Sequence, residues 1–366
     1  MKGKRRAPDY LLLAAMLALV CVGVVMVFSS SISLSRALVG HQWHFIHRQI
    51  LWTVLGAIAM FITSRLPYRN WQKLSTIGLI GTLVLLVLVW MPGVGVTIQG
   101  SSRWISLGLV RIQPSELAKV TLILWVADRL ARRPGRLNSF WSGTLPLLIV
   151  VGAVAGLVLL QPDLGTAVAI VVAFALILFV AGLPLGQMLA LGGVGAALLA
   201  LFIRIAPYRM ERFVAFLDPW KDPLDTGYHI IQSLYAIGTG GLFGRGWGSG
   251  WQKHFFLPEP HNDFIFATLA EELGFFGGSV LILLFIGVAA RGMRVALRAP
   301  DRFAALVATG ITAMIVAQAM MNFAVVTGSV PVTGIPLPLV SYGGSSLLIV
   351  MSSIGILVNI SKYAQE

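Results

Sequence analysis

The segment from Pro207 to Asp263, which ends Phe256-Leu257-Pro258-Glu259-Pro260-His261-Asn262-Asp263, is the one long polar stretch in a chain of apolar runs. Apolar windows long enough to cross a bilayer as α-helices lie on both sides of it. We identify ten, at residues 10–30, 45–64, 74–91, 113–131, 144–160, 165–182, 185–205, 264–290, 303–326 and 341–360. An open sheet would leave backbone groups unpaired in lipid, so the sequence predicts an all-α polytopic membrane protein with about ten transmembrane helices.

Composition supports one membrane domain over residues 1–366. Hydrophobic residues make up 57% of the chain and charged residues only 11%, whereas soluble domains are about 25% charged. No small-residue cleavage site follows the first apolar run, which is therefore predicted to be a span and not a cleaved signal peptide.

The positions of Lys and Arg in the short loops predict the orientation of the chain. Basic clusters alternate along the sequence as Lys2, Lys4, Arg5 and Arg6; Arg65, Arg69 and Lys73; Arg129, Arg132, Arg133 and Arg136; and Arg291, Arg294, Arg298 and Arg302. We expect both termini in the cytoplasm, and residues 206–263 as one large extracytoplasmic loop between spans seven and eight. The same pattern accounts for most of the formal charge of +13, so we expect no nucleic-acid partner.

The outer loop divides into three parts. The first, Pro207–Pro223, contains three prolines and is predicted to be irregular. The second, Tyr228–Ile237, places its apolar residues on one stripe and predicts a short interfacial helix. The third holds seven glycines between Gly238 and Gly250. These glycines would let backbone N–H groups approach a phosphate or sugar, but their spacing matches no phosphate-binding motif and favours a flexible hinge.

Asp263 stands where the polar loop meets a long apolar run. Burial raises the pKa of a carboxyl group and neighbouring cations lower it, so such a site is suited to accepting a proton. Asp is also a preferred helix N-cap, and Phe264 begins the apolar run, so a capping role is the alternative.

Arg111, Glu116 and Lys119 form a second candidate cluster. A charge such as Lys119 inside a span is costly, and is commonly functional or paired. Cations near the outer interface would stabilise a pyrophosphate. The alternative is a structural ion pair, because Glu116 and Lys119 are three residues apart, with a lysine that extends to the interface.

Two further sets of titratable residues have open interpretations. Glu271 and Glu272 are carboxylates inside a predicted span, which suit a proton relay or ion site, or a structural pair with an arginine on a neighbouring span. The histidines all fall on the predicted outer side, but His44 and His47 complete no zinc signature with the others.

Together the polar motifs resemble the SEDS family of bacterial shape, elongation, division and sporulation proteins. The motifs occur in the family's order and span nearly the whole chain: Gly100-Ser101-Ser102-Arg103-Trp104-Ile105, Gln113-Pro114-Ser115-Glu116 with Lys119, Gln161-Pro162-Asp163-Leu164-Gly165-Thr166, Phe216-Leu217-Asp218-Pro219-Trp220-Lys221-Asp222-Pro223, Gln232-Ser233, Leu257-Pro258-Glu259-Pro260-His261 with Asp263, Pro331-Val332-Thr333-Gly334 and Ser341-Tyr342-Gly343-Gly344-Ser345-Ser346. Gln252-Lys253 followed by Phe256–Pro260 looks closer to the division and sporulation branch than to the RodA branch. Asn262 departs from the family's usual threonine.

The resemblance implies a peptidoglycan glycosyltransferase in the bacterial cytoplasmic membrane that polymerises lipid II into glycan strands at the outer face. It implies a class B penicillin-binding protein as partner, with the lipid bilayer and other division or elongation proteins around it. The family's essential aspartate corresponds to Asp263, and its basic pair to Arg111 and Lys119. Further substrate contacts are expected at motif residues Arg103, Glu116, Gln232, Ser233, Lys253 and His261.

The implied reaction is an inverting displacement. Asp263 would take the proton from the acceptor hydroxyl, and undecaprenyl pyrophosphate would leave from the donor sugar. A divalent cation, Mg²⁺ or Mn²⁺, would suit the pyrophosphate, but no ligand cluster in the sequence demands one. Two alternatives are a lipid II flippase, which would bind its substrate near the midplane, and a scaffold that only recruits the penicillin-binding protein. The concentration of polar motifs at one face favours the enzyme.

Overall fold

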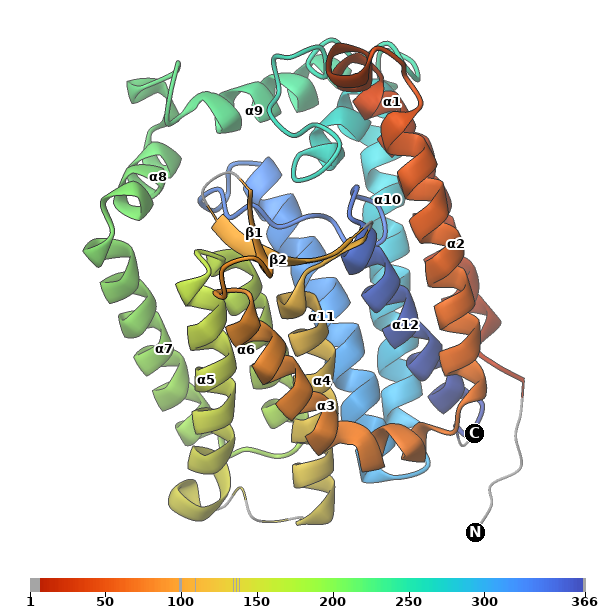
Figure 1. The fold of residues 1–366 in the computed structure, drawn as a ribbon, viewed down its shortest axis with the longest axis vertical. Helices are drawn as coiled ribbons and strands as arrows, with labels where there is room; N and C mark the ends of the chain where they lie inside the picture. The colour runs from red at the N-terminus through yellow and green to blue at the C-terminus, as the bar shows by residue number, and fades with distance from the viewer. Residues whose placement is uncertain are drawn as a thin grey trace.

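In the computed structural model the chain forms a bundle of long helices (Figure 1). The structure describes residues 7–98, 101–108, 110–133, 135, 137 and 139–364. Its long helices are α1 (Tyr10–Val39), α2 (His44–Arg65), α3 (Tyr68–Leu88), α4 (Pro114–Arg132), α5 (Leu145–Leu160), α6 (Leu164–Val180), α7 (Leu185–Ile205), α10 (Ile265–Leu297), α11 (Arg302–Val326) and α12 (Gly344–Ser361). The shorter helical segments are η2 (Phe140–Thr144), α8 (Pro207–Leu217), η3 (Pro219–Lys221) and α9 (Tyr228–Gly240).

Each predicted span falls on one of the long helices. In the described part of the chain, eight helices are long and apolar enough to cross a membrane. Of the other two, α6 is apolar but has 17 residues, and α4 carries the charges of Glu116, Lys119 and Asp128. The polytopic helical fold is confirmed, and the count of ten spans stays a prediction.

α11 and α12 form the centre of the bundle, where most of their residues are buried. In contrast, α7 has no buried residue and lies at the edge of the bundle (Figure 1). α2 packs closely against α12 because position 355 is glycine. A β-carbon on Gly355 would lie 1.9 Å from Thr63 Oγ1. Small residues permit this kind of close approach between membrane helices.

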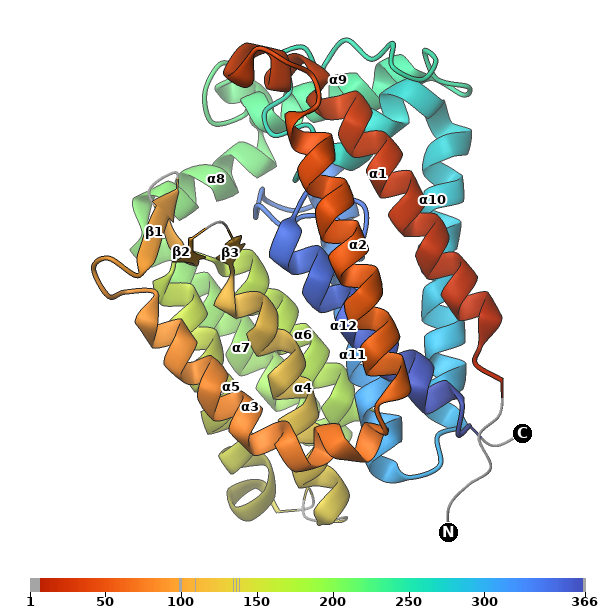
Figure 2. The same ribbon diagram turned by 45° about the vertical axis from the view of Figure 1, so that its right-hand side comes forward.

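The first and last described helices meet at one end of the bundle (Figures 1 and 2). Asp9 caps α1 and accepts from Arg291 Nη2 at 2.7 Å, while its backbone N–H donates to Ser361 Oγ at 3.1 Å. At this same end Tyr68 donates to Asp301 at 2.6 Å. The basic residues Lys2, Lys4, Arg5, Arg6 and Arg136 lie outside the described residues. A cytoplasmic location for this end stays a prediction.

Between α3 and α4 the described residues form a three-stranded antiparallel sheet that the sequence reading did not predict. Its strands are β1 (Gly95–Ile98), β2 (Ser101–Leu107) and β3 (Val110–Ile112), in the order β1-β2-β3. Ile105 pairs with Gly95 on one side and Ile112 on the other. The strands are too short to span a bilayer. They lie in a loop, where the unpaired backbone N–H and C=O groups at the sheet edges can bond to water. The exclusion of open sheets from lipid therefore does not apply to them.

The segment that precedes Asp263 is more ordered than its prolines suggested. Pro207–Leu217 is the helix α8, so the prediction of an irregular segment is wrong there. Pro207 occupies the first helical turn, where proline needs no hydrogen-bond donor and its φ fits the helix. The predicted short helix at Tyr228–Ile237 is confirmed as α9. Figure 2 shows α8 and α9 passing over the end of the bundle that carries the sheet.

Candidate active site

Asp263 lies in a turn just before α10 and does not cap it. Asn262 and Phe264 both donate backbone N–H groups to Glu259 O, at 3.0 and 3.4 Å. The N-cap position belongs to Phe264, and no side chain bonds there. The capping alternative for Asp263 is therefore wrong. Asn322 Nδ2 of α11 donates to Asp263 O at 2.7 Å and fixes the backbone of the turn.

Asp263 is half-buried, and its Oδ1 atom is buried without a hydrogen-bond partner among the described residues. A β-carbon built on Gly334 would lie 3.5 Å from Oδ2, so the Pro331–Gly334 motif passes directly beside the carboxyl group. Burial raises the pKa of Asp263 to about 7. At neutral pH the group is therefore divided between its acid and base forms, which is the state expected of a general base.

Both acidic and basic groups surround this carboxyl. The negative charges of Glu259 and Asp163 add to the increase in its pKa. The guanidinium groups of Arg103 and Arg212 oppose it. Asp163 is held by Gln113 Nε2 at 3.3 Å and caps α6 through the N–H of Thr166. Residues far apart in the sequence therefore act on one proton-accepting group.

Arg103 connects the sheet to the hairpin between α5 and α6. Its Nε donates to Gln161 O at 3.0 Å, and its Nη2 donates to Pro162 O. The chain reverses here because Asp163 and its neighbours leave almost no loop between two apolar helices. Arg103 is thus fixed in place beside Asp263, where it can face an anionic substrate.

His261 lies between two aromatic rings near the same site. Its ring centroid is 4.8 Å from that of Phe45 and 5.6 Å from that of Tyr342. Burial lowers the pKa of His261, and the nearby Glu259 partly opposes this effect. The imidazole is therefore neutral at pH 7, and its Nδ1 has no partner among the described residues. His261 is almost completely buried, and a sugar contact by its imidazole stays a prediction.

Arg111 on β3 is exposed. Its charge and that of Arg48 on α2 both act on the hydroxyl of Tyr342. Arg111 is therefore available to a substrate at the end of the bundle.

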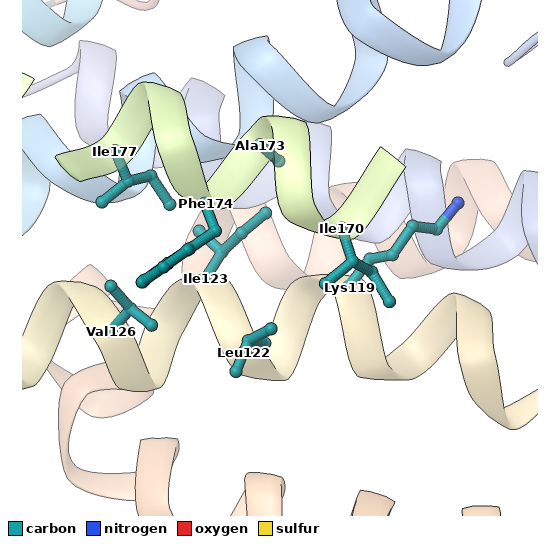
Figure 3. A pocket seen from close by; sticks show the side chains of 8 residues that line it. All are labelled: Lys119, Leu122, Ile123, Val126, Ile170, Ala173, Phe174 and Ile177. Carbon is teal, nitrogen blue, oxygen red and sulfur yellow. The ribbon is translucent and has the colours of Figure 1, made fainter. Parts of the chain in front are cut away.

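Lys119, by contrast, is buried inside the bundle. Its Nζ lies 2.8 Å from Glu116 Oε1 and donates to Gln318 Oε1 at 2.8 Å. Ser346 donates to the other oxygen of Glu116 at 2.8 Å. Figure 3 shows the lysine beside an apolar cavity of about 10 Å³, which has room for about one water molecule. This contact fits the structural ion pair, although the Lys119 side chain is buried and does not extend to the interface as that alternative expected. A pyrophosphate contact by Lys119 stays a prediction.

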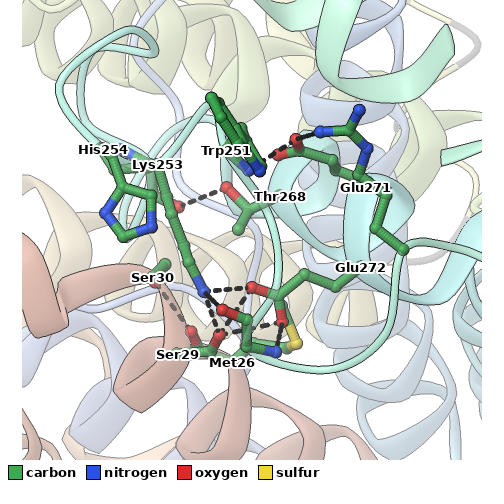
Figure 4. Close-up of polar contacts among 12 residues, drawn as sticks. Met26, Ser29, Ser30, Trp251, Lys253, His254, Thr268, Glu271 and Glu272 are labelled. Atoms are coloured by element: carbon green, nitrogen blue, oxygen red, sulfur yellow. Dashed lines mark hydrogen bonds and ion pairs between the residues drawn. The ribbon is translucent and has the colours of Figure 1, made fainter. Parts of the chain in front are cut away.

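Glu271 and Glu272 hold the glycine-rich segment against α10 (Figure 4). Glu271 accepts from the N–H of Trp251 at 2.7 Å, and Glu272 accepts from Lys253 Nζ at 2.6 Å. Lys253 also donates to Ser29 Oγ of α1 at 2.9 Å. The partners of these carboxylates thus include the outer loop and α1, which favours the structural interpretation.

A break in α10 reinforces this attachment. Gly274 has φ 67° and ψ −164° inside the helix, a conformation that favours glycine. The carbonyls of Glu271 and Glu272 accept instead from the N–H groups of Arg245 and Gly246, each at 3.0 Å. In return, the N–H groups of residues 275 and 276 donate to the carbonyls of residues 241 and 242, at 2.9 and 3.2 Å. These bonds argue against a flexible hinge over this part of the glycine-rich run.

The motif Gln232-Ser233 anchors α9. Ser233 is buried and its Oγ donates to Val326 O at the end of α11, at 2.7 Å. Gln232 is half-buried beside it. The structure therefore gives Ser233 a packing role, and substrate contacts by either residue stay predictions.

Three residues of this region, Arg48, Arg212 and His229, were not identified as site residues from the sequence. Arg212 lies on α8 and acts on both Asp263 and His229. Burial, together with the charge of Arg212, lowers the pKa of His229, whose Nδ1 has no partner in the described chain. Arg48 acts on Tyr342. A search for basic residues on amphipathic helices of the outer loop would have found Arg212.

The described residues contain no group of three or more His, Cys, Asp and Glu side chains placed to hold a metal ion. A divalent cation, Mg²⁺ or Mn²⁺, stays a prediction, because Mg²⁺ is commonly held by one or two carboxylates together with substrate phosphates.

Comparison with known proteins identifies the family of the chain. The profile of the FtsW, RodA and SpoVE family, described as "Cell cycle protein", matches residues 9–366. Stage V sporulation protein E of Bacillus subtilis is 43% identical over 365 residues, covering 100% of both chains. A probable peptidoglycan glycosyltransferase FtsW of Geobacter sp. (strain M18) is 42% identical, covering 98% of both.

Two solved structures share the fold over nearly the whole chain. One is a chain from a peptidoglycan synthase complex that coordinates polymerization and crosslinking, with TM-score 0.80, 32% identity and coverage of 98% of this chain and 99% of that one. The other is the rod shape determining protein RodA of Thermus thermophilus, with TM-score 0.73, 31% identity and 98% coverage of both chains. The chain therefore belongs to the SEDS family of membrane proteins that includes FtsW, RodA and SpoVE.

Proposed function

We propose that this protein is a peptidoglycan glycosyltransferase that polymerises lipid II into glycan strands at the outer face of the bacterial cytoplasmic membrane. The observation that carries the proposal is the Asp263 carboxyl group, whose Oδ1 is buried and unpartnered among the described residues and whose pKa is raised by burial to about 7. The names of the relatives FtsW and the peptidoglycan synthase complex support the same activity.

Asp263 acts as the general base. Its carboxylate accepts the proton of the acceptor sugar's 4-hydroxyl group as that oxygen attacks the anomeric carbon of the donor. The bond from this carbon to the pyrophosphate oxygen breaks, and undecaprenyl pyrophosphate leaves. One displacement converts the α-linked donor into a β-linked product, so no covalent enzyme intermediate is needed.

The leaving pyrophosphate needs positive charge. Arg103 and Arg212 are the cations that act on Asp263, and Arg111 is exposed nearby on β3. Fixed cations stabilise charge as it develops in the transition state. Lys119 would contribute indirectly, by holding the start of α4 in place through Glu116 and Gln318. A divalent cation, if required, would arrive with the pyrophosphate.

The positions of the polar residues favour this enzyme over a flippase. A transporter binds substrate near the bilayer midplane, usually through broken helices. The break at Gly274 in α10 is filled by bonds to the outer loop, and the buried Lys119 pair leaves space for about one water molecule. A protein that acted only as a scaffold would have no need of an unpartnered carboxyl group that is acted on by two arginines.

The partner we propose is a class B penicillin-binding protein, which would cross-link the peptides of the strands made here. Support comes from the similarity to a chain of a peptidoglycan synthase complex. Other division, elongation or sporulation proteins would recruit the pair.

The test is reconstitution of the purified protein in liposomes with labelled lipid II, with and without the penicillin-binding protein. Asp225→Asn serves as the matched control, because Asp225 is an exposed carboxylate of the same outer segment. We expect strands from the native protein and the control, and none from Asp263→Asn. Movement of lipid II between leaflets without strands would contradict the proposal, as would strands that depend only on the partner.

A further inference from the structure

A second cavity lies at the end of the bundle away from the candidate active site. It has a volume of about 390 Å³ and lies where α4 ends and η2 leads into α5. In Figure 1 this is the end that carries both termini. One wall carries three arginines of the end of α4, Arg129, Arg132 and Arg133. No residue that lines it in the described chain is acidic.

Most of the positive charge of this cavity is not neutralised within the described chain. Arg132 pairs with Asp128 at 2.7 Å. Arg129 has only a long hydrogen bond to Thr76, at 3.5 Å, and stacks over the ring of Trp125 at 5.4 Å. Arg133 is exposed and forms no ion pair with a described residue. Two of the three guanidinium groups are therefore free to bind an anion.

The rest of the lining is polar at one point and otherwise apolar. Ser142 and Gly143 belong to η2, a π-helical turn. Such turns occur often at functional sites. Leu130 and Leu147 supply apolar walls. Trp141, next to the cavity in sequence, is 77% exposed, as expected of tryptophan at a membrane interface.

We propose that this cavity binds the phosphate-bearing headgroup of an anionic phospholipid in the cytoplasmic leaflet. Arginine recognises phosphate through paired N–H donors, and basic pockets between membrane helices on the cytoplasmic side suit anionic headgroups. The apolar walls and the exposed tryptophan favour a lipid over a soluble phosphate, because acyl chains would continue along the apolar surface of α5. The site is separate from the proposed catalytic residues.

The experiment is native mass spectrometry of the full-length protein, released from membranes of mixed phosphatidylglycerol and phosphatidylcholine. The variant is Arg129→Gln with Arg133→Gln. The matched control is Arg294→Gln with Arg298→Gln, two exposed arginines at the end of α10 that do not line this cavity. Each arginine near an anionic lipid contributes about five-fold to binding, so we expect the variant to retain about thirty-fold less phosphatidylglycerol. The control should retain it as the native protein does.

Arg133→Gln alone keeps the test informative if the double variant fails to fold, and we expect about a five-fold loss from it. Equal retention in variant and control would overturn the proposal. A second arm adds inorganic phosphate and glycerol phosphate to the native protein. Arginine-dependent binding of these soluble anions, with no preference for phosphatidylglycerol, would overturn the lipid as the source.

Discussion

The pair formed by Lys253 and Glu272 attaches the outer loop to the bundle, and its contribution to stability can be measured. Both side chains are almost completely buried, and Lys253 Nζ lies 2.6 Å from Glu272 Oε1. Glu272 also accepts from Ser29 Oγ at 2.6 Å and from the N–H of Gly248 at 3.0 Å. Substituting either member of the pair alone therefore leaves a buried polar or charged group.

The perturbation is Lys253→Met, which keeps an unbranched side chain only one atom shorter and removes its charge. Glu272 then remains buried as an uncompensated carboxylate with only neutral donors, which we expect to cost about 3–5 kcal/mol of the free energy of unfolding. Adding Glu272→Gln removes that charge, so the double variant should lose about 2 kcal/mol less than the sum of the single variants. Lys221→Met, at an exposed lysine of the same outer segment, should change stability by less than about 0.5 kcal/mol.

The assay is reversible unfolding in mixed detergent micelles for the native protein, both single variants, the double variant and the control. Limited proteolysis within residues 241–253 provides a local measurement, and we expect faster cleavage in Lys253→Met. Additive losses, with a coupling below about 0.5 kcal/mol, would refute the reasoning. So would a variant as stable as the native protein with an unchanged cleavage rate.

The remaining predictions concern pH, charge and packing. The rate of polymerisation should rise with pH through about 7, because only the unprotonated Asp263 accepts a proton. Glu259→Gln should move the midpoint of this rise to lower pH, because the charge of Glu259 raises the pKa of Asp263. A flat pH profile would contradict the assignment of Asp263 as the base. Because burial raises the pKa of folded Asp263 from the ordinary value of 3.8 to about 7, the stability that this group contributes falls as pH rises from about 4 to about 7. Asp263→Asn should therefore raise the thermal stability at pH 8 and change it little at pH 4; the reverse pattern would be inconsistent with a raised pKa. Gly355→Val should lower the free energy of unfolding by about 1–3 kcal/mol, because the new side chain would push α12 away from Thr63. Gly156→Ala, at a position with open space around it, should be nearly neutral in the same unfolding assay. Equal effects would exclude the close contact as the cause.

The helices were predictable from the sequence because apolar length alone determines a spanning helix, and each predicted run lies on one. The sheet at β1–β3 was not, because β3 has only 3 residues and β2, Ser101–Leu107, does not alternate apolar and polar residues as a strand pattern requires. α8 was missed because prolines were taken as breaks, although Pro207 stands at a permitted helical position.

The candidate site was only partly predictable. Asp263 was identified from its place between a polar loop and an apolar run, and Arg103 from its motif. Arg48 and Arg212 come from segments that no local pattern connects to Asp263 or Tyr342. Lys119 could not be distinguished from a substrate contact, because its partner Gln318 lies on a helix distant in sequence. The role of Glu272 depends on the break at Gly274, which a regular helical pattern does not reveal.

The measurement that tests the central claim most directly is lipid II polymerisation by the native protein, Asp263→Asn and Asp225→Asn, each verified as folded by its thermal transition. The account predicts glycan strands from the native protein and from Asp225→Asn, and none from Asp263→Asn at any pH between about 5.5 and about 9. Strands from Asp263→Asn at a rate close to the native one would contradict it, because a carboxamide cannot accept the proton.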